Sequence, residues 1–329
     1  MALTAPRVVI LRALGLGDLC TAVPALRAVA AAFPDHQRLL AAPAWQTPIA
    51  RQCGVDRVVA TTGLEALPDE LAGADVAVDL HGRGPQSIRL LVRLRPDRMI
   101  AFRHASVPQS WAGPEWRRDE HEIDRWCRLL AHFDVPADRH DLHLTPIGLP
   151  PADVDDRVVV HPGAAALGRR WPPSRFAAVI AGVLAAGQGV VLTGSHDERA
   201  LCSQIREEAG AAGAAGVIDL SGRTDLEQLC ATVAAARAVL SNDTGIAHLA
   251  VAYGVPTVTL FGPTSPATWG PPDDPRHRVI WHGTTGDPHA TTLDPGLDVI
   301  TVAEVTSALA DVLAIGPRLR PPDLRQVAG

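Results

Sequence analysis

The stretch that decides the fold is residues 241–263, SNDTGIAHLAVAYGVPTVTLFGP. Residues 238–240 before it read as a short buried strand, and residues 241–245 supply turn and N-cap residue types. Apolar residues then recur at helical spacing until Gly254, and residues 256–261 form a second apolar run. The stretch therefore predicts a strand, a turn, a helix and a strand. The N–H groups at such a helix start suit a nucleotide phosphate, although an ordinary capped helix has the same pattern.

The first half of the chain predicts repeated strand and helix units. Residues 7–14 read as a strand, and an Ala-rich helix that extends to residue 33 follows them, with Thr21 as its cap and Pro24 in its first turn. Asp18 would then stand on the turn at the carboxyl edge of the sheet, where open α/β folds bind ligands. Further strands are expected at 39–42, 57–60, 76–80 and 99–102, helices at 87–94 and 122–133, and a long loop over the interlobe cleft at 103–118.

The second half repeats this pattern after a linker at residues 147–151, which contains two prolines and a glycine. Strands are expected at 157–161, 190–193 and 217–220, and helices at 173–186, 197–209, 225–236 and 301–313. The alternation predicts an α/β fold with two doubly wound parallel sheets. We place the domains at residues 1–150 and 151–316, with a loose tail at 317–329.

Composition excludes several classes of protein. The formal net charge is −6 and all 30 basic residues are arginine, which argues against nucleic-acid partners and against lysine chemistry. Five scattered cysteines and the lack of a signal-like N-terminus favour a cytoplasmic protein without a transmembrane segment, although peripheral membrane contact stays open. Gly15 and Gly17 could begin a dinucleotide fingerprint, but Cys20 stands where its third glycine belongs.

Several motifs occur together in an informative order. They are Gly17-Asp18, the segments 161–163 and 169–172, the helix start at 243–249, and Phe261-Gly262-Pro263-Thr264-Ser265-Pro266. Together they closely resemble glycosyltransferase family 9, the ADP-heptose:lipopolysaccharide heptosyltransferases. The similarity is strong at residues 11–28 and 158–266 and weak at residues 95–150.

The resemblance implies a GT-B architecture, in which two Rossmann-like halves face each other across a cleft. It implies an acceptor on the N-terminal half, an ADP-sugar donor on the C-terminal half, and inversion at the anomeric carbon without a metal or cofactor. Asp18 matches the family's general base, which takes the proton of the attacking hydroxyl. By itself, an aspartate in such a turn could equally cap a helix. Gly17, His81 and Arg83 are the candidate acceptor-binding residues.

The resemblance also implies a donor site in the second half. Arg169 stands where the family usually has lysine, and it would neutralise the leaving diphosphate together with the backbone of Thr244 and Gly245. Asp243 would hold a sugar hydroxyl, and His248 would either reach the phosphates or bind a neighbouring carbonyl. One of Asp197 and Glu198 would bind the ribose. The remaining donor-site candidates are Gly163, Gly194, Arg223 and Thr224.

Other functions fit the same pattern. A sugar-nucleotide epimerase and a non-catalytic nucleotide-sugar binder share the double Rossmann-like architecture. Within the transferase reading, the donor is most simply ADP-heptose, and another nucleotide-diphospho-sugar is the alternative. The acceptor is a glycan, a lipid-linked glycan or a small soluble metabolite, because no basic cluster marks a phosphorylated lipid.

Overall fold

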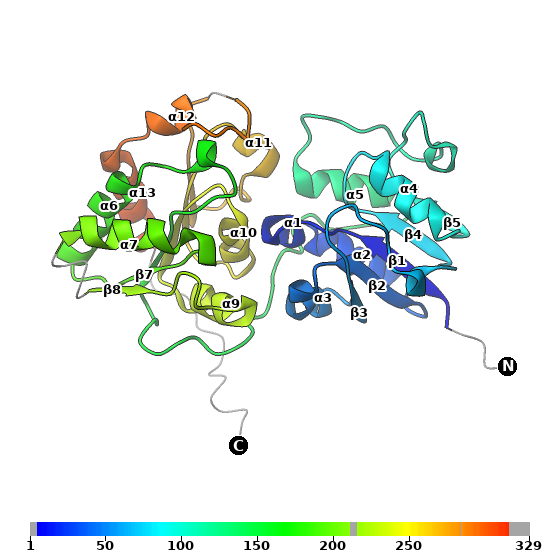
Figure 1. Cartoon of the computed structure of the whole chain (residues 1–329), viewed down its shortest axis with the longest axis horizontal. Helices are drawn as coiled ribbons and strands as arrows, with labels where there is room; N and C mark the ends of the chain where they lie inside the picture. The colour runs from blue at the N-terminus through cyan, green and yellow to red at the C-terminus, as the bar shows by residue number, and fades with distance from the viewer. Residues whose placement is uncertain (1–4, 211–215, 284, 316–329) are drawn as a thin grey trace, which may run out of the picture.

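The computed structural model describes residues 5–210, 216–283 and 285–315, and it contains two parallel β-sheets packed with helices (Figure 1). The first sheet, with its helices, forms the N-terminal lobe. Its strand order is β3-β2-β1-β4-β5, and every pair is parallel. Its strands are β1 (Arg7–Leu11), β2 (Gln37–Ala42), β3 (Arg57–Ala60), β4 (Val76–Asp79) and β5 (Arg98–Ile100).

The second sheet forms the C-terminal lobe and has the order β11-β10-β9-β6-β7-β8, again all parallel. Counted from β6, this is the 3-2-1-4-5-6 order of a doubly wound nucleotide-binding fold. The expected α/β class with two doubly wound parallel sheets is confirmed. The strands are β6 (Val158–His161), β7 (Val190–Leu192), β8 (Val217–Asp219), β9 (Ala238–Asn242), β10 (Thr257–Leu260) and β11 (His277–Ile280).

Helices connect most of the successive strands in both lobes (Figure 1). In the N-terminal lobe they are α1 (Leu16–Thr21), α2 (Val23–Ala32), α3 (Thr47–Gln52), α4 (Gln86–Arg93) and α5 (Glu122–His132). In the C-terminal lobe they are α6 (Pro173–Ala185), α7 (Arg199–Glu208), α9 (Leu226–Ala235), α10 (Gly245–Ala252), α11 (Pro266–Trp269), α12 (Pro295–Asp298) and α13 (Val302–Leu313). Short 3₁₀ turns lie at η1 (Ala44–Gln46), η2 (Asp69–Leu71), η3 (Pro108–Ser110), η4 (Leu167–Arg169) and η5 (His196–Glu198).

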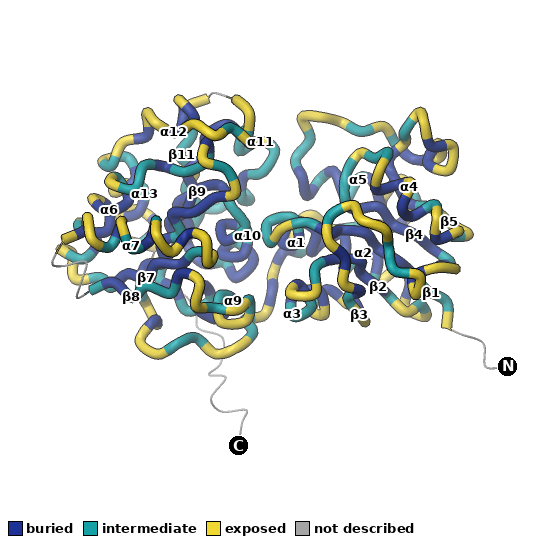
Figure 2. The backbone as a smooth tube through the Cα atoms, viewed as in Figure 1, coloured by how far each residue is buried: buried dark blue, intermediate teal, exposed yellow. Residues whose placement is uncertain are grey.

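Central strands such as β1 and β6 are nearly continuous apolar runs because both faces of a parallel sheet are covered. Figure 2 shows both sheets as buried segments, and the valines of β1 and β6 are completely buried. One apolar cluster runs through both lobes, since it joins Leu26 and Leu129 of the N-terminal lobe to Val239 and Leu249 of the C-terminal lobe. The two lobes therefore share buried surface.

Some predicted elements differ from the structure. The helix expected up to residue 33 is two helices, because Pro24 has no N–H and cannot continue the ladder of α1. Thr21 is the last residue of α1, so its predicted role as a helix cap is wrong. The helix expected at 197–209 begins as η5, and β9 continues through Asn242 into the expected turn.

The strand β11 was not expected from the sequence. Its four residues, HRVI, are a short edge segment with two basic side chains and only a partial apolar pattern. The proposed boundary at residues 150/151 falls between the two sheets and stays a prediction, and the expected tail at 317–329 lies outside the described residues.

Candidate active site

Several of the predicted site residues follow the four strands that meet at the switch points of the two sheets. In the N-terminal lobe, Asp18 follows β1 and His81 follows the neighbouring strand β4. In the C-terminal lobe, Gly163 follows β6 and Thr244 follows the neighbouring strand β9. Ligands of open α/β sheets bind at these points because the connections there leave in opposite directions. The topology thus places each group of candidates where its sheet can bind a ligand.

Asp18 lies inside the first turn of α1 and not on the preceding turn, which corrects the expected placement. Its Oδ2 accepts a hydrogen bond from the Gly15 backbone N–H at 3.2 Å, as acidic residues at a helix start commonly do. The side chain keeps 28% of its surface exposed. Burial raises the pKa of Asp18 above its ordinary value, Arg12 opposes this shift, and Glu122 adds to it. Asp18 is therefore a partly accessible carboxylate with enhanced basicity.

The two lobes touch where α1 meets α10, and glycine makes this contact possible (Figure 1). A β-carbon on Gly17 would lie 3.0 Å from His248 Cδ2 and 3.3 Å from Gly245 Cα. A β-carbon on Gly245 would lie 2.8 Å from the Gly17 backbone nitrogen. The structure therefore brings the start of the Asp18 helix to the start of the predicted phosphate-binding helix. Gly17 makes an interlobe contact here, and its predicted acceptor contact stays a prediction.

Arg169 and Asp243 form an ion pair beside the start of α10. The Arg169 Nη2 lies 3.0 Å from Asp243 Oδ2 and also donates to the Asp243 carbonyl oxygen. Asp243 is 5% exposed, and burial raises the pKa of this carboxyl while Arg169 lowers it. The paired carboxylate has a protein partner, so its proposed contact with a sugar hydroxyl stays a prediction.

Two buried polar atoms near this pair have no hydrogen-bond partner among the described residues. They are Arg169 Nε and Thr244 Oγ1. Thr244 is the N-cap residue of α10, yet its side chain makes no cap hydrogen bond. Buried polar atoms in folded proteins usually have a partner, so the unpaired donor and the unpaired hydroxyl at this helix start are groups that a polar ligand would satisfy.

His248 lies on α10 against Trp269 of α11, with ring centroids 5.8 Å apart. Burial lowers the pKa of His248 to about 4, and nearby His121 and Arg169 act in the same direction. The ring is therefore neutral at pH 7 and can offer one N–H. Its predicted contact with the phosphates stays a prediction.

The predicted ribose carboxylates occupy different environments. Asp197 is exposed in η5, whereas Glu198 is buried and accepts from the Ser195 backbone N–H at 2.7 Å. Glu198 Oε1 also lies 3.6 Å from Arg170 Nη2. Of the two carboxylates, Glu198 has internal partners and Asp197 is open to solvent, so the choice between them stays a prediction.

Two predicted glycines leave room for the Glu198 side chain. A β-carbon on Gly163 would lie 2.0 Å from Glu198 Oε1, and one on Gly194 would lie 3.2 Å from Glu198 Cβ. A methyl group at Gly163 therefore requires Glu198 to move, whereas one at Gly194 would make a tight contact. Their predicted role in donor binding is untested, but their structural role follows from this geometry.

We expect Gly163→Ala to destabilise the protein by about 1–3 kcal/mol, because the new methyl group displaces a buried carboxylate from its partners. Gly182→Ala is the matched control, since Gly182 is exposed on α6 and its added methyl group meets nothing within 4 Å. The control should be neutral or stabilising by about 0.5–1 kcal/mol. Urea denaturation measures both values. Equal stability of the two variants would contradict the packing of Glu198 against Gly163.

Arg223 and Thr224 lie between β8 and α9, immediately before the α9 N-cap residue Asp225. Arg223 is exposed and its backbone N–H donates to the Leu220 carbonyl at 3.0 Å. Thr224 is half-buried. The structure thus places both at the carboxyl end of β8, and their predicted donor contact stays a prediction.

His81 follows β4, and the positive charge of Arg12 acts on its pKa. Burial, together with the positive charge of Arg12, lowers the pKa of His81 to about 4. Its backbone N–H donates to Asp79 Oδ1 at 3.0 Å, while its buried Nδ1 has no partner within the described part of the chain. Arg83, two residues later, is exposed. The predicted acceptor contacts of His81 and Arg83 stay predictions.

The sequence reasoning missed two buried charged residues next to Asp18. Arg12 is completely buried at the end of β1, and Glu122 is 5% exposed at the start of α5. Arg12 Nη2 lies 3.3 Å from Glu122 Oε1 and 3.7 Å from Asp18 Oδ1. A lone arginine at the end of a buried strand was the available signal, because a buried charge needs a partner.

The long segment at 103–118 contains η3 and borders a cavity of about 470 Å³, which is lined by Arg103, Ala105, Trp111, Glu115 and Trp116. In the described ranges, no group of three or more His, Cys, Asp or Glu side chains is arranged to hold a metal ion. Nor does any helix there have both the length and the apolar character needed to cross a bilayer.

Comparison with known proteins decides the family. The model of glycosyltransferase family 9 (heptosyltransferase) matches residues 98–294, more than half of the chain. The chain belongs to this family. The matched range includes the segment after residue 98, where we expected weak similarity, and it leaves out residues 11–28. The family assignment therefore rests on the second half of the chain and on the loop and helix before it.

Individual members of the family are similar to the chain to different extents. Lipopolysaccharide heptosyltransferase 2 of Salmonella typhimurium is 35% identical over 112 residues, which is 34% of this chain and 32% of that protein. The match thus spans about a third of that relative's length. Lipopolysaccharide heptosyltransferase 1 of Pseudomonas aeruginosa is 27% identical over 293 residues, covering 80% of this chain and 81% of that protein.

A solved structure extends the likeness to the whole fold. The structure of Escherichia coli ADP-heptose lps heptosyltransferase II superposes with a TM-score of 0.75 at 20% identity, covering 94% of this chain and 99% of that one. At this identity the likeness shows the fold alone. It confirms the expected GT-B arrangement of two Rossmann-like lobes.

Proposed function

We propose that this protein is an inverting glycosyltransferase that moves heptose from ADP-heptose to an acceptor hydroxyl without a bound metal. One observation carries the proposal beyond family membership. The helix that bears Asp18 packs directly against the start of α10, through Gly17 and Gly245. A candidate base and a candidate phosphate site, which come from different sheets, thus meet at one interlobe contact.

In the proposed reaction, the acceptor oxygen forms a bond to the anomeric carbon of the donor sugar. The bond between that carbon and the diphosphate oxygen breaks, and ADP leaves with the electron pair. Asp18 takes the hydroxyl proton of the acceptor, so the attacking oxygen gains charge as the bond forms. The raised pKa of Asp18 supports this role, because a more basic carboxylate accepts a proton more readily.

The C-terminal lobe would stabilise the departing diphosphate. The first turn of α10 supplies backbone N–H groups and the positive end of the helix dipole. Arg169 adds a full positive charge next to this turn, and its buried Nε lacks a partner among the described residues, as does Thr244 Oγ1. Negative charge that develops on the leaving diphosphate would thus be stabilised by hydrogen-bond donors that are already oriented.

The nature of the donor rests on the relatives. The similar protein from Escherichia coli carries ADP-heptose in its description, and the family model is described as heptosyltransferase. We extend this donor to the present chain. Two relatives are named lipopolysaccharide heptosyltransferases, so the proposed acceptor is a hydroxyl of a glycan.

A thermal-shift panel tests the donor. We expect ADP-heptose and ADP to raise the melting temperature by several degrees, because a ligand at about a hundredfold excess over its Kd adds about 2.7 kcal/mol to stability. UDP-, GDP- and dTDP-sugars at the same concentration are the controls and should have much smaller effects. The shift should persist in EDTA, since Arg169 and the α10 backbone would bind the diphosphate without a metal. An equal shift with UDP-sugars, or its loss in EDTA, would refute this assignment.

A further inference from the structure

Arg12 has an unusual position for an arginine, because its side chain is completely buried at the end of β1. Its Nε donates to the Asp18 carbonyl oxygen at 2.6 Å, and its Nη2 donates to Thr21 Oγ1 at 3.2 Å. Its Nη1 donates to the Leu80 carbonyl oxygen at the end of the neighbouring strand. The guanidinium therefore ties the first turn of α1 to the switch point between β1 and β4.

The same guanidinium binds Glu122, which comes from a distant part of the chain. Nη2 of Arg12 lies 3.3 Å from Glu122 Oε1 and 3.7 Å from Asp18 Oδ1. Glu122 Oε1 also accepts from Trp126 Nε1 at 2.8 Å, and the arginine carbon Cζ lies 5.0 Å from the Trp126 ring centroid. Asp18 and Glu122 thus both contact the buried Arg12 guanidinium. The Trp126 indole holds Glu122 from another side.

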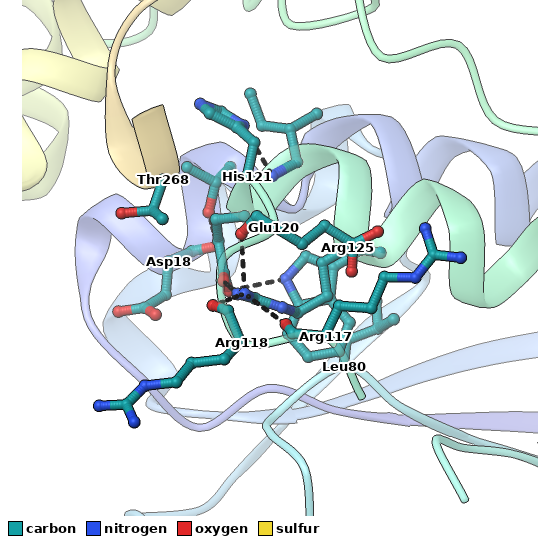
Figure 3. A network of polar contacts seen from close by, with 12 residues as sticks. Asp18, Leu80, Arg117, Arg118, Glu120, His121, Arg125 and Thr268 are labelled. Atoms are coloured by element: carbon teal, nitrogen blue, oxygen red, sulfur yellow. Dashed lines mark hydrogen bonds and ion pairs between the residues drawn. The ribbon is translucent and has the colours of Figure 1, made fainter. Parts of the chain in front are cut away.

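The network formed by Arg12, Asp18 and Glu122 also holds the segment that leads into α5. Arg125 pairs with Glu122 and donates through Nη2 to the carbonyl oxygens of Arg117, Arg118 and Glu120 (Figure 3). Asp18 appears beside this network in the same view. The backbone of this segment and the Asp18 helix are therefore fixed by two arginines that share one glutamate.

We propose that Arg12 and Glu122 are positioning residues for Asp18: Arg12 orients the carboxylate, and Glu122 takes part of the arginine's charge away from it. This inference rests on the proposed function, in which Asp18 is the base. An arginine paired with Asp18 alone would hold the carboxylate in place but would also make it a poor proton acceptor. The shared glutamate lets the same guanidinium orient Asp18 and leave it basic.

The charges around Asp18 agree with this division of roles. Burial raises the pKa of Asp18, Arg12 lowers it, and Glu122 raises it. From the facing elements, His248 on α10 is neutral because burial lowers its pKa to about 4. His121, before α5, contacts the Gly270 carbonyl through Nε2, and its Nδ1 accepts from the Ile123 N–H. Arg12 and Glu122 are the charged side chains that act on the pKa of Asp18.

Titration of Asp18 by NMR tests the proposal without any substrate. The ¹³Cγ signals of labelled aspartates are followed against pH, and the signal that is missing in Asp18→Asn identifies Asp18. We expect Glu122→Gln to lower the pKa of Asp18 by about one pH unit, because a nearby negative charge is removed. The acid limb of kcat, measured with ADP-heptose and deacylated lipopolysaccharide core, should move to lower pH by the same amount.

Glu120→Gln is the matched control. Glu120 lies two residues away, is similarly buried, and pairs with Arg128 at 2.6 Å instead of Arg12. Its variant should leave the pKa of Asp18 at the wild-type value. If Glu122→Gln also leaves the pKa of Asp18 unchanged, or if both variants shift this pKa equally, the positioning role is refuted.

If Glu122→Gln does not fold, Arg12→Lys replaces it as the test variant, since lysine keeps the charge but not the planar fork of donors. We then expect kcat to fall at least about tenfold with little change in donor KM, and an unchanged kcat would refute the proposal.

The activity of Asp18→Asn and the pKa of Asp18 in Glu122→Gln together distinguish a failure of this inference from a failure of the proposed function. Inactive Asp18→Asn together with a wild-type Asp18 pKa in Glu122→Gln would overturn the positioning role alone. Active Asp18→Asn together with a shifted pKa would overturn the base assignment, and with it the catalytic meaning of the pair, while the coupling of the charges would stand.

Discussion

Asp18→Asn should lower the rate of heptose transfer by about 1,000-fold, within the range of about 10²–10⁴ that a positioned general base contributes. The asparagine Oδ1 can still accept from the Gly15 N–H, which donates to Asp18 Oδ2 at 3.2 Å, so the first turn of α1 should remain intact. The amide cannot take a proton from the acceptor hydroxyl. ADP binding should stay at the wild-type level, because the proposed donor site lies on the other lobe. Steady-state kinetics and calorimetry with ADP measure the two effects.

Glu304→Gln is the matched control for Asp18→Asn. Glu304 occupies the same third position in α13, where its Oε2 accepts from the Thr301 N–H at 2.7 Å. This variant should keep wild-type activity. Transfer by Asp18→Asn within tenfold of wild type would remove Asp18 from the mechanism. Product analysis in the same assay separates a transferase from an epimerase, since only a transferase forms a new glycosidic bond to the acceptor.

Arg169→Ala should have the second large effect, and it should reduce both catalysis and stability. The loss of one preoriented cation beside the leaving group is expected to lower kcat by about 10²–10³-fold. The variant also leaves Asp243 as a buried carboxylate without its arginine, which should cost about 3 kcal/mol. Kinetics with ADP-heptose and urea denaturation measure the two losses.

Two variants test whether these losses come from the pairing itself. Arg169→Lys restores the charge as a single point and should recover most of the activity. Arg57→Ala removes an arginine whose pair with Glu70 is exposed, so it should change stability by less than about 1 kcal/mol. An Arg169→Ala enzyme with wild-type kcat would exclude the arginine from diphosphate stabilisation. An Arg169→Ala protein with wild-type stability would show that the buried Asp243 carboxylate does not need Arg169 as its partner.

Most regular elements were predictable because the chain repeats one short unit. Apolar β-branched runs such as β1 and β6 alternate with amphipathic or Ala-rich segments, and a parallel sheet buries such strands on both faces. The split between α1 and α2 and the edge strand β11 were missed for different reasons. Pro24 interrupts a helix ladder without changing its apolar pattern, and β11 has charged residues because it lies at an edge.

The candidate site was predictable in part. The residues after β1 and β9 could be selected from turn chemistry and from the resemblance of their motifs to the family. The position of Asp18 inside α1 was not predicted, because Leu16 and Gly17 look like turn residues before the helix is seen. The pairing of Asp243 with Arg169 was also missed, since these residues are 74 positions apart.

The sequence by itself determined the class of the fold, the repeated strand and helix order, and the family motifs, because all three are local patterns of residue type and spacing. Only the tertiary structure decided that Gly17 meets Gly245 and that Arg12 reaches Glu122, 110 residues away. Such contacts depend on how the strands are ordered in each sheet and on how the two lobes pack. Neither leaves a local pattern in the chain, so the partners of the buried charges become visible only after folding brings their strand ends together.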